Sequence, residues 1–478
     1  MDSVPLVVLT GQTITTNLGK DAFQEADVFG VTMPVVKHSY LVRDVDDLPR
    51  IMNEAFHLAI SGRPGPVLVD LPKDVVSAEC NTDFTDELHL PGYNPPGEAP
   101  EEQVSKAADP INQAQRPVIL AGHGVLISQA YRELRELAEK AQIPVVTTLL
   151  GISSLPSSHY LNLGMAGMHG LACASLAINE SDLLISLGMR FDDRVTGRLK
   201  DFAPNARVVH VDIDPSELDK NVKADAPVAG DLKQVLNQLL PKVDANVHIE
   251  WLRYTDNLRV EHPSTQIRET QELLPQYVLN ELSKAANGEA LIVTGVGQHQ
   301  MWAAQYCEFQ EPNTLITSGG LGTMGFEVPA ALGAKLGRPE KTIWSVAGDG
   351  GFQMTMCDLA TAVENNADIK FAILNNGRLG MVHQLQDLSY DRNHFATIYS
   401  GNPDFVKLAE AYGIAGIRVT EKERTAEAIQ QAMETPGPVI VDFMVRETEN
   451  VFPWIPAGES VNEMLEETSP GKVGEIPS

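Results

Sequence analysis

Short runs of β-branched and aliphatic residues alternate with amphipathic helical patterns along most of this 478-residue chain. Strands are expected at residues 117–121, 144–148, 183–187, 208–213, 291–294, 314–317, 342–347, 370–374, 414–419 and 439–445. Helices are expected at 128–141, 325–336 and 425–433, where apolar residues recur at helical spacing. Strands that alternate with helices form βαβ units, in which parallel strands share a sheet covered by helices. The pattern therefore predicts an α/β fold built from doubly wound parallel sheets.

Two polar stretches divide the chain into predicted domains. Residues 79–103 are rich in proline, glycine and acids, and residues 241–270 are polar with weak periodicity, so both are expected to be linkers. They separate segments 1–78, 104–240 and 271–446, followed by a tail at 447–478. A predicted strand within residues 4–9 begins almost at Met1, and the first domain is therefore expected to be incomplete.

Charge and cysteine usage exclude several classes of partner. The chain has 64 acidic and 36 basic residues, a net charge of −28. Nucleic acids and anionic membranes are bound by clustered Lys and Arg, so neither is expected as a partner. No apolar run approaches the roughly 18 residues of a membrane span. The four cysteines show neither disulfide-framework nor metal-ligand spacing, which favours a reducing, cytoplasmic location.

One internal echo links the two ends of the chain. The segment Arg63-Pro-Gly-Pro-Val-Leu-Val-Asp70 resembles Thr435-Pro-Gly-Pro-Val-Ile-Val-Asp442, at an offset of 372 positions (436 minus 64). The echo indicates either chance reuse of a common turn-plus-strand pattern or two homologous domains. If the domains are homologous, the beginning of the third segment maps about 100 positions before Met1.

The strongest chemical motif joins two strand ends. Gly348-Asp349-Gly350-Gly351 follows one predicted strand, and twenty-four residues separate Gly350 from Asn375-Asn376 at the end of another. Ligands of open α/β sheets bind at these ends, and glycines let the backbone approach a diphosphate. The Asp349 carboxylate and the Asn376 amide oxygen are hard donors suited to Mg²⁺. This is the spacing of the thiamine-diphosphate motif; the alternative is a glycine turn beside an unrelated asparagine pair.

Longer segments resemble the catalytic subunit of the acetohydroxyacid synthase (acetolactate synthase) family. They include Gly167-Met-His-Gly170, Arg190-Phe-Asp-Asp-Arg-Val-Thr-Gly197, Gly295-Val-Gly-Gln-His-Gln-Met-Trp302 and Ser318-Gly-Gly-Leu-Gly322. The resemblance implies three α/β domains of thiamine-diphosphate-enzyme type, with thiamine diphosphate, Mg²⁺ and FAD as cofactors. It also implies a homodimer or homotetramer and a small regulatory subunit as a partner.

The resemblance assigns residues to the thiamine-diphosphate site. Asp349, Asn376 and the Arg378 carbonyl would hold Mg²⁺, and Met381 would prop the bent cofactor. The remaining cofactor contacts would be Gln298, His299, Gly322, Thr323, Met324, Gly350, Gly351 and Gly380. Two plainer interpretations stay open: Met381 as core packing, and His299 as an ordinary polar residue at a helix start.

Other assignments concern substrate and flavin. Phe23, Gln24 and Lys73 would line the substrate entry, and Arg194 would face a substrate carboxylate unless it only pairs with Asp192 or Asp193. The FAD site would be lined by Arg63, Gly122, Gly124, Met168, His169, Gly188, Arg190, Asp212, Asp214 and Asp231. The residues alone support this site only through a Gly-His-Gly turn and an acidic strand end.

The implied reaction is decarboxylation of pyruvate and condensation of the two-carbon unit with a second 2-oxo acid, pyruvate or 2-oxobutyrate. The products are 2-acetolactate and 2-aceto-2-hydroxybutyrate, precursors of valine, leucine and isoleucine. Leu385 stands where many members have tryptophan, which puts preference for 2-oxobutyrate in doubt. The family's activating glutamate is not matched by any residue here, so the chain alone is expected to be weak or inactive. Alternatives are a non-catalytic subunit and another thiamine-diphosphate carboligase.

Overall fold

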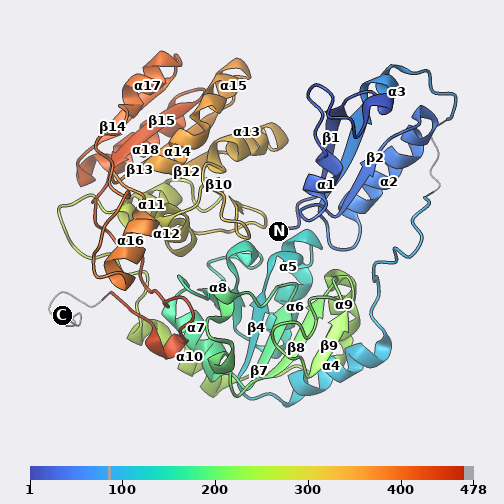
Figure 1. Ribbon diagram of the computed structural model, residues 1–478. Coiled ribbons are helices and arrows are strands. Elements are labelled where there is room, and N and C mark those ends of the chain that lie inside the picture. Colours follow the sequence, from blue (N-terminus) through green and yellow to red (C-terminus); the bar gives the residue numbers. More distant parts are fainter. Residues whose placement is uncertain (84–87, 468–478) are drawn as a thin grey trace. The chain divides into compact units, whose positions relative to one another are not determined.

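The computed structural model describes residues 1–83 and 88–467 (Figure 1). These residues form two compact units. The smaller unit comprises Met1–Ala99 with Ile213–Pro215 and Ala229–Asp231, and the larger unit comprises the rest of the chain. Both units contain parallel sheets with helical connections, so the predicted α/β fold class is confirmed.

The smaller unit contains a three-stranded parallel sheet in the order β1-β3-β2. The strands are β1 (Leu6–Gln12), β2 (His38–Leu41) and β3 (Pro66–Pro72), and the helices are α1 (Val28–Thr32), α2 (Leu48–Ile60) and α3 (Lys73–Ser77). Helix α2 forms because Ile51, Ala55 and Leu58 recur at helical spacing, and all three are buried against the sheet. β1 begins two residues later than predicted.

The first sheet of the larger unit has the order β6-β5-β4-β7-β8-β9. Its strands are β4 (Pro117–Ala121), β5 (Val145–Thr147), β6 (Asn162–Met165), β7 (Leu183–Leu187), β8 (Arg207–Asp212) and β9 (Ala226–Ala229). Its helices are α4 (Glu101–Gln113), α5 (His123–Ile127), α6 (Tyr131–Ala141), α7 (Ala172–Glu180), α8 (Asp193–Thr196), α9 (Leu232–Leu239) and α10 (Ile249–Glu261). The central strands β4 and β7 are wholly buried, as their continuous apolar sequences predict.

The second sheet of the larger unit is parallel throughout, in the order β11-β10-β12-β13-β15-β14. Its strands are β10 (Leu291–Thr294), β11 (Leu315–Thr317), β12 (Ile343–Gly348), β13 (Ile369–Asn375), β14 (Ala415–Val419) and β15 (Val439–Met444). Helices α11 (Pro275–Ala285), α12 (Gln298–Tyr306) and α18 (Thr425–Glu434) share one apolar core with the sheet. Helices α13 (Glu327–Gly337), α15 (Leu359–Glu364) and α17 (Phe405–Ala411) share the core on the other face, and α14 (Asp349–Thr355) and α16 (Gly380–Ser389) follow strand ends (Figure 1).

The internal echo falls on structurally matching strands. β3 lies between β1 and β2, and β15 lies between β13 and β14, so each echo strand is the middle one of three. The buried carboxylate of Asp70 accepts hydrogen bonds from Thr10 Oγ1 (2.7 Å) and Gln12 Nε2 (3.0 Å). The buried Asp442 accepts one from Asn375 Nδ2 (3.0 Å). In one sheet Asp70 is paired with Thr10, and Gln12 lies two residues after Thr10. In the other sheet Asp442 is paired with Ile373, and Asn375 lies two residues after Ile373. The two amide side chains therefore occupy the same position relative to their acids.

Most predicted strands lie within two residues of their expected bounds, but one predicted linker is wrong. Residues 241–270 contain α10, in which Trp251, Thr255 and Leu258 are buried at helical spacing. The Trp251 indole N–H also donates to the Pro117 carbonyl at 2.9 Å. Charged residues between these three positions hid the apolar stripe. Within residues 1–83 and 88–467, no helix is both long and apolar enough to cross a membrane.

Candidate functional site

The main candidate site lies at the switch point of the second sheet of the larger unit. β10 has β11 on one side and β12 on the other, so the connections that leave β10 and β12 run in opposite directions. The carboxyl ends of two such strands flank a crevice, where α/β proteins bind ligands. Helix α12 begins at Gln298 just after β10, and α14 begins at Asp349 directly after β12. Both helix N-termini therefore meet at this crevice.

Asp349 is a buried carboxylate held by hydrogen bonds. Its Oδ1 accepts from the Gly350 N–H (3.0 Å), and its Oδ2 accepts from the Gly377 N–H (2.8 Å) and from Asn402 Nδ2. Burial raises the pKa of Asp349 to about 6, and the hydrogen bonds from Asn402 and the backbone oppose this increase. A divalent cation would compensate the buried negative charge, because bound cations favour the ionised form of their ligands.

Asn376 and Gln298 are positioned by a chain of buried amides. Asn376 Nδ2 lies 3.4 Å from Gln298 Oε1, and Gln298 Nε2 donates to Gln384 Oε1 (2.9 Å) and to the Glu449 carbonyl (2.7 Å). Gln384 in turn bonds both the N–H and the carbonyl of Val451. Asn376 Oδ1 accepts a hydrogen bond from the Arg378 N–H at 3.2 Å, and its second lone pair can serve a cation.

His299 is buried on the first turn of α12, and burial lowers its pKa to about 3. The imidazole is therefore neutral, and its Nε2 has no hydrogen-bond partner within residues 1–83 and 88–467. Glu327, at the start of α13, is also fully buried, and among the residues that the structure describes neither of its carboxylate oxygens has a well-aligned donor. Burial raises the pKa of Glu327 to about 7, although the N–H groups of Glu327 and Gly325 act in the opposite direction. Unpartnered buried polar groups are costly and mark places where a ligand completes the hydrogen bonding.

Ten of the residues assigned to the thiamine-diphosphate site line one cavity. They are Gln298, His299, Met324, Asp349, Gly350, Gly351, Asn376, Arg378, Gly380 and Met381. Gly322 lies beside the cavity, since a Cβ placed on it would be 3.6 Å from Val296, which is part of the lining. Thr323 is held by a bond from its N–H to Ser318 Oγ (3.2 Å), and Leu385 is a partly exposed residue of α16.

Two glycines of this cavity pack so closely against neighbouring side chains that neither position can carry a side chain of its own. A Cβ at Gly350 would lie 2.0 Å from the Tyr399 hydroxyl, and one at Gly380 would lie 2.1 Å from Gln298 Oε1. The absence of a side chain at Gly350 and Gly380 therefore lets Tyr399 and Gln298 pack directly against the backbone beside the cavity. The His299 imidazole, the carboxylate of Asp349 and the amide oxygen of Asn376 line the cavity and supply polar groups for a diphosphate with its cation. The cavity therefore fits the group that the sequence motif predicts.

The glycines assigned to the flavin site meet at the switch point of the first sheet of the larger unit. β4 has β5 on one side and β7 on the other, and Gly122 and Gly124 follow β4 while Gly188 follows β7. A Cβ at Gly124 would lie 2.6 Å from Gly188 Cα, and one at Gly122 would lie 2.4 Å from the Gly188 carbonyl oxygen. Any side chain here would force the two loops apart.

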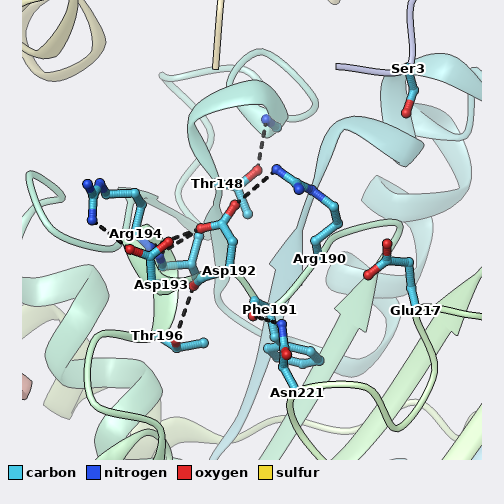
Figure 2. Close-up of polar contacts among 12 residues, drawn as sticks. Ser3, Thr148, Arg190, Phe191, Asp192, Asp193, Arg194, Thr196, Glu217 and Asn221 are labelled. Carbon is cyan, nitrogen blue, oxygen red and sulfur yellow. Dashed lines mark hydrogen bonds and ion pairs between the residues drawn. The ribbon is translucent and has the colours of Figure 1, made fainter. Parts of the chain in front are cut away.

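Asp192 holds the segment that follows β7 through hydrogen bonds and an ion pair (Figure 2). The Asp192 carboxylate caps α8 by accepting from the Arg194 and Val195 N–H groups, and it pairs with Arg190 at 3.3 Å. Arg194 instead reaches Asp193 at 2.7 Å, and both side chains are exposed. This is the plainer surface pairing that the sequence left open for Arg194.

His169 and Met168 lie in the same region, and Asp212 ends β8 in a buried position. Burial lowers the pKa of His169 to about 4, with a smaller effect from Arg194, and its Nδ1 is buried without a partner. The Met168 carbonyl accepts from the Ile455 N–H (2.8 Å), so the C-terminal tail packs against this segment.

The remaining predicted residues belong to the smaller unit. Phe23, Gln24 and Lys73 are exposed, and Gln24 has a positive φ of 59°. Arg63 pairs with Asp214 at 3.2 Å, and the Asp231 N–H donates to the Gly97 carbonyl at 2.8 Å.

Three residues near the main cavity were missed by the sequence analysis. Asn402 bonds both Asp349 and Asn375, Gln384 anchors Gln298, and Glu327 lies beside His299. A lone acid within an apolar helix could have drawn attention to Glu327. Asn402 carries no such signal, because it lies in an irregular segment far along the chain.

Comparisons with known proteins agree with this geometry. The central domain of thiamine pyrophosphate enzymes matches residues 104–239, and their C-terminal TPP binding domain matches residues 295–443. Acetolactate synthase of Mycobacterium leprae is 48% identical over 97% of the chain and 76% of its own length. The acetolactate synthase large subunit of Corynebacterium glutamicum is 47% identical over 96% of the chain and 75% of its own length. The large subunit of acetolactate synthase isozyme 1 of Escherichia coli is 40% identical over 98% of the chain and 82% of its own length. The chain therefore belongs to the acetolactate synthase large subunit family of thiamine-diphosphate-dependent enzymes.

Proposed function

We propose that this protein is an acetolactate synthase that decarboxylates pyruvate and joins the two-carbon unit to a second 2-oxo acid. The products would be 2-acetolactate or 2-aceto-2-hydroxybutyrate, on the route to valine, leucine and isoleucine. The observation that carries the proposal is that Gln298, His299, Asp349 and Asn376 all line one cavity, at the β10/β12 switch point. When bound, thiamine diphosphate supplies the electron sink that lets the carboxylate leave as CO₂.

The chain's own residues would hold and orient that group. Asp349, Asn376 and the Arg378 carbonyl would bind Mg²⁺, an arrangement supported by oxygen donors on adjoining strand ends. The N-termini of α12 and α14 would favour the diphosphate charge. Met381, which packs against the apolar core of the sheet and lines the cavity, would support the bound cofactor through apolar contact.

FAD is proposed as a second cofactor, at the β4/β7 switch point. The position of Gly122, Gly124 and Gly188 just after the adjoining strands β4 and β7 supports this site, because dinucleotides bind at the switch point of such sheets. The unpartnered Nδ1 of His169 and the carboxylate of Asp212 at the end of β8 add polar groups of the kind that such a ligand uses. FAD would act mainly as structure.

Substrate contacts and assembly are further parts of the proposal. Phe23, Gln24, Lys73, Arg194 and Leu385 would contact or admit the 2-oxo acids. The enzyme would work as a homodimer or homotetramer, with a small regulatory subunit, in the cytoplasm. All four cysteines are free thiols, which suits a reducing compartment.

The experiment is a calorimetric titration of the purified chain with thiamine diphosphate, with Mg²⁺ and then with excess chelator, followed by a pyruvate assay. Binding is expected only with the cation, and it should be lost in Asp349→Asn, whose neutral side chain binds Mg²⁺ poorly. Any acetolactate formed from pyruvate should also be absent in this variant. Failure of the wild-type chain to bind thiamine diphosphate with millimolar Mg²⁺ would refute the proposal.

A further inference from the structure

Glu327 is a buried acid near the cavity whose two carboxylate oxygens lack hydrogen-bond partners among the described residues. The proposed chemistry assigns it no role. The residue opens α13 and is wholly inaccessible to solvent, yet neither carboxylate oxygen has a well-aligned partner in the described part of the chain. Its neighbours in the sequence, Phe326 and Val328, are apolar core residues. A buried acid of this kind costs stability, so its presence beside a ligand cavity calls for a function.

An unpartnered nitrogen of His299 lies close to this carboxyl group. A Cβ built on Gly295 would lie 2.3 Å from Glu327 Oε2 and 2.8 Å from His299 Nε2. Because both atoms are that close to one point, they lie within about 5 Å of each other. Gly295 has no side chain to separate them. A small movement of either side chain therefore brings the carboxyl and the imidazole nitrogen into hydrogen-bond contact.

The other nitrogen of the imidazole lies close to two glycines of the cavity lining. His299 Nδ1 would lie 3.0 Å from a Cβ on Gly348 and 3.2 Å from one on Gly297, and both glycines line the cavity. A neutral imidazole carries one proton, so one nitrogen is a donor and the other an acceptor. A diphosphate can only accept hydrogen bonds, and it therefore needs the proton on Nδ1.

We propose that Glu327 is a positioning residue that, in its protonated form, donates a hydrogen bond to His299 Nε2 and so keeps the His299 proton on Nδ1, facing the cofactor diphosphate. The inference rests on the proposed function, because it assumes that thiamine diphosphate occupies the cavity. In the same way, buried partners of metal-binding histidines fix the tautomer through the second ring nitrogen.

Two substitutions separate a donor role from packing. Glu327→Met keeps an unbranched side chain of similar length but removes the donor, whereas Glu327→Gln keeps a donor in its amide N–H. By calorimetric titration in Mg²⁺, Glu327→Met is expected to weaken thiamine diphosphate binding about tenfold or more, and Glu327→Gln by about threefold at most. Glu133→Met is the matched control: Glu133 also has a buried, unpartnered carboxylate oxygen, but it lies on α6 of the other sheet.

A second readout follows the proton itself. In nitrogen NMR of histidine-labelled protein, the His299 signal is identified by its absence from His299→Gln. The wild-type and Glu327→Gln proteins should show the Nδ1–H tautomer, and Glu327→Met should show a mixture or the Nε2–H form. If Glu327→Met does not fold, Glu327→Ala takes its place in both measurements.

The outcomes are distinct. Wild-type affinity in Glu327→Met, equal losses in the Met and Gln variants, or an unchanged tautomer would each overturn the role of Glu327 while leaving the proposed function standing. Absence of thiamine diphosphate binding by the wild-type chain would instead refute the proposed function.

Discussion

Replacing Glu327 by glutamine is expected to change how the stability of the cofactor-free protein depends on pH. Burial raises the pKa of Glu327 to about 7, from an ordinary value of 4.5. Between these values the folded protein holds a proton that the unfolded chain releases. Its free energy of unfolding therefore falls as the pH rises, by about 3 kcal/mol in total. Below this window the full stability is present, and above it the cost of the buried charge is complete.

Stability is best measured above the isoelectric point of about 4.7, where the net negative charge keeps the protein in solution. Most of the pH-dependent loss of stability falls in this range. From about pH 5.5 to about pH 8, the linkage relation gives a loss of about 2 kcal/mol in the wild type that the glutamine variant escapes. Urea unfolding followed by tryptophan fluorescence is suitable, because all four tryptophans lie in the larger unit. The lowered pKa of His299 gives an opposite slope, but this slope is shared by both proteins and cancels in their difference. A stability difference that stays constant over this range would refute the reasoning.

Three further outcomes are expected. Asp442→Ala should lower the free energy of unfolding by about 3 kcal/mol in the same urea assay, because it removes the partner of Asn375 and Arg418, and Asp442→Asn should lose less. Arg194→Ala should leave the urea midpoint unchanged, since Arg194 and Asp193 are exposed, but it should raise the KM for pyruvate; an unchanged KM would remove Arg194 from the substrate site. Leu385→Trp should shift product formation towards 2-aceto-2-hydroxybutyrate when pyruvate and 2-oxobutyrate compete, and an unchanged product ratio would contradict the assignment of Leu385.

The strands could be predicted from sequence because buried parallel strands are continuous apolar runs. β4, β7 and β10 begin and end where the sequence indicates. Helix α10 could not be predicted, because its buried stripe is narrow and its remaining positions are polar or charged. The bounds of helices were predicted less accurately than those of strands: α6 begins at Tyr131, three residues after its predicted start.

The candidate site was predictable where a local motif carries it. Asp349 and Asn376 follow directly from their positions after two strands, and the structure brings both to one cavity. Contacts that join distant segments were not predictable, as with Asn402, which reaches Asp349 from fifty-three positions away. Side-chain pairing is equally hidden from sequence: whether Arg194 meets Asp192 or Asp193 depends on the cap of α8.

The matching acids of β3 and β15 bear on the ancestry of the two sheets. Each acid accepts a hydrogen bond from an amide side chain at the same register of the adjoining strand, Gln12 in one sheet and Asn375 in the other. Shared strand order, shared sequence and a shared amide-to-acid bond are the pattern that duplication of one gene segment leaves behind. On that view the two copies kept this hydrogen bond between neighbouring strands and diverged one residue later, where the chain has Asn376 of the ligand cavity in one copy and Thr13 in the other.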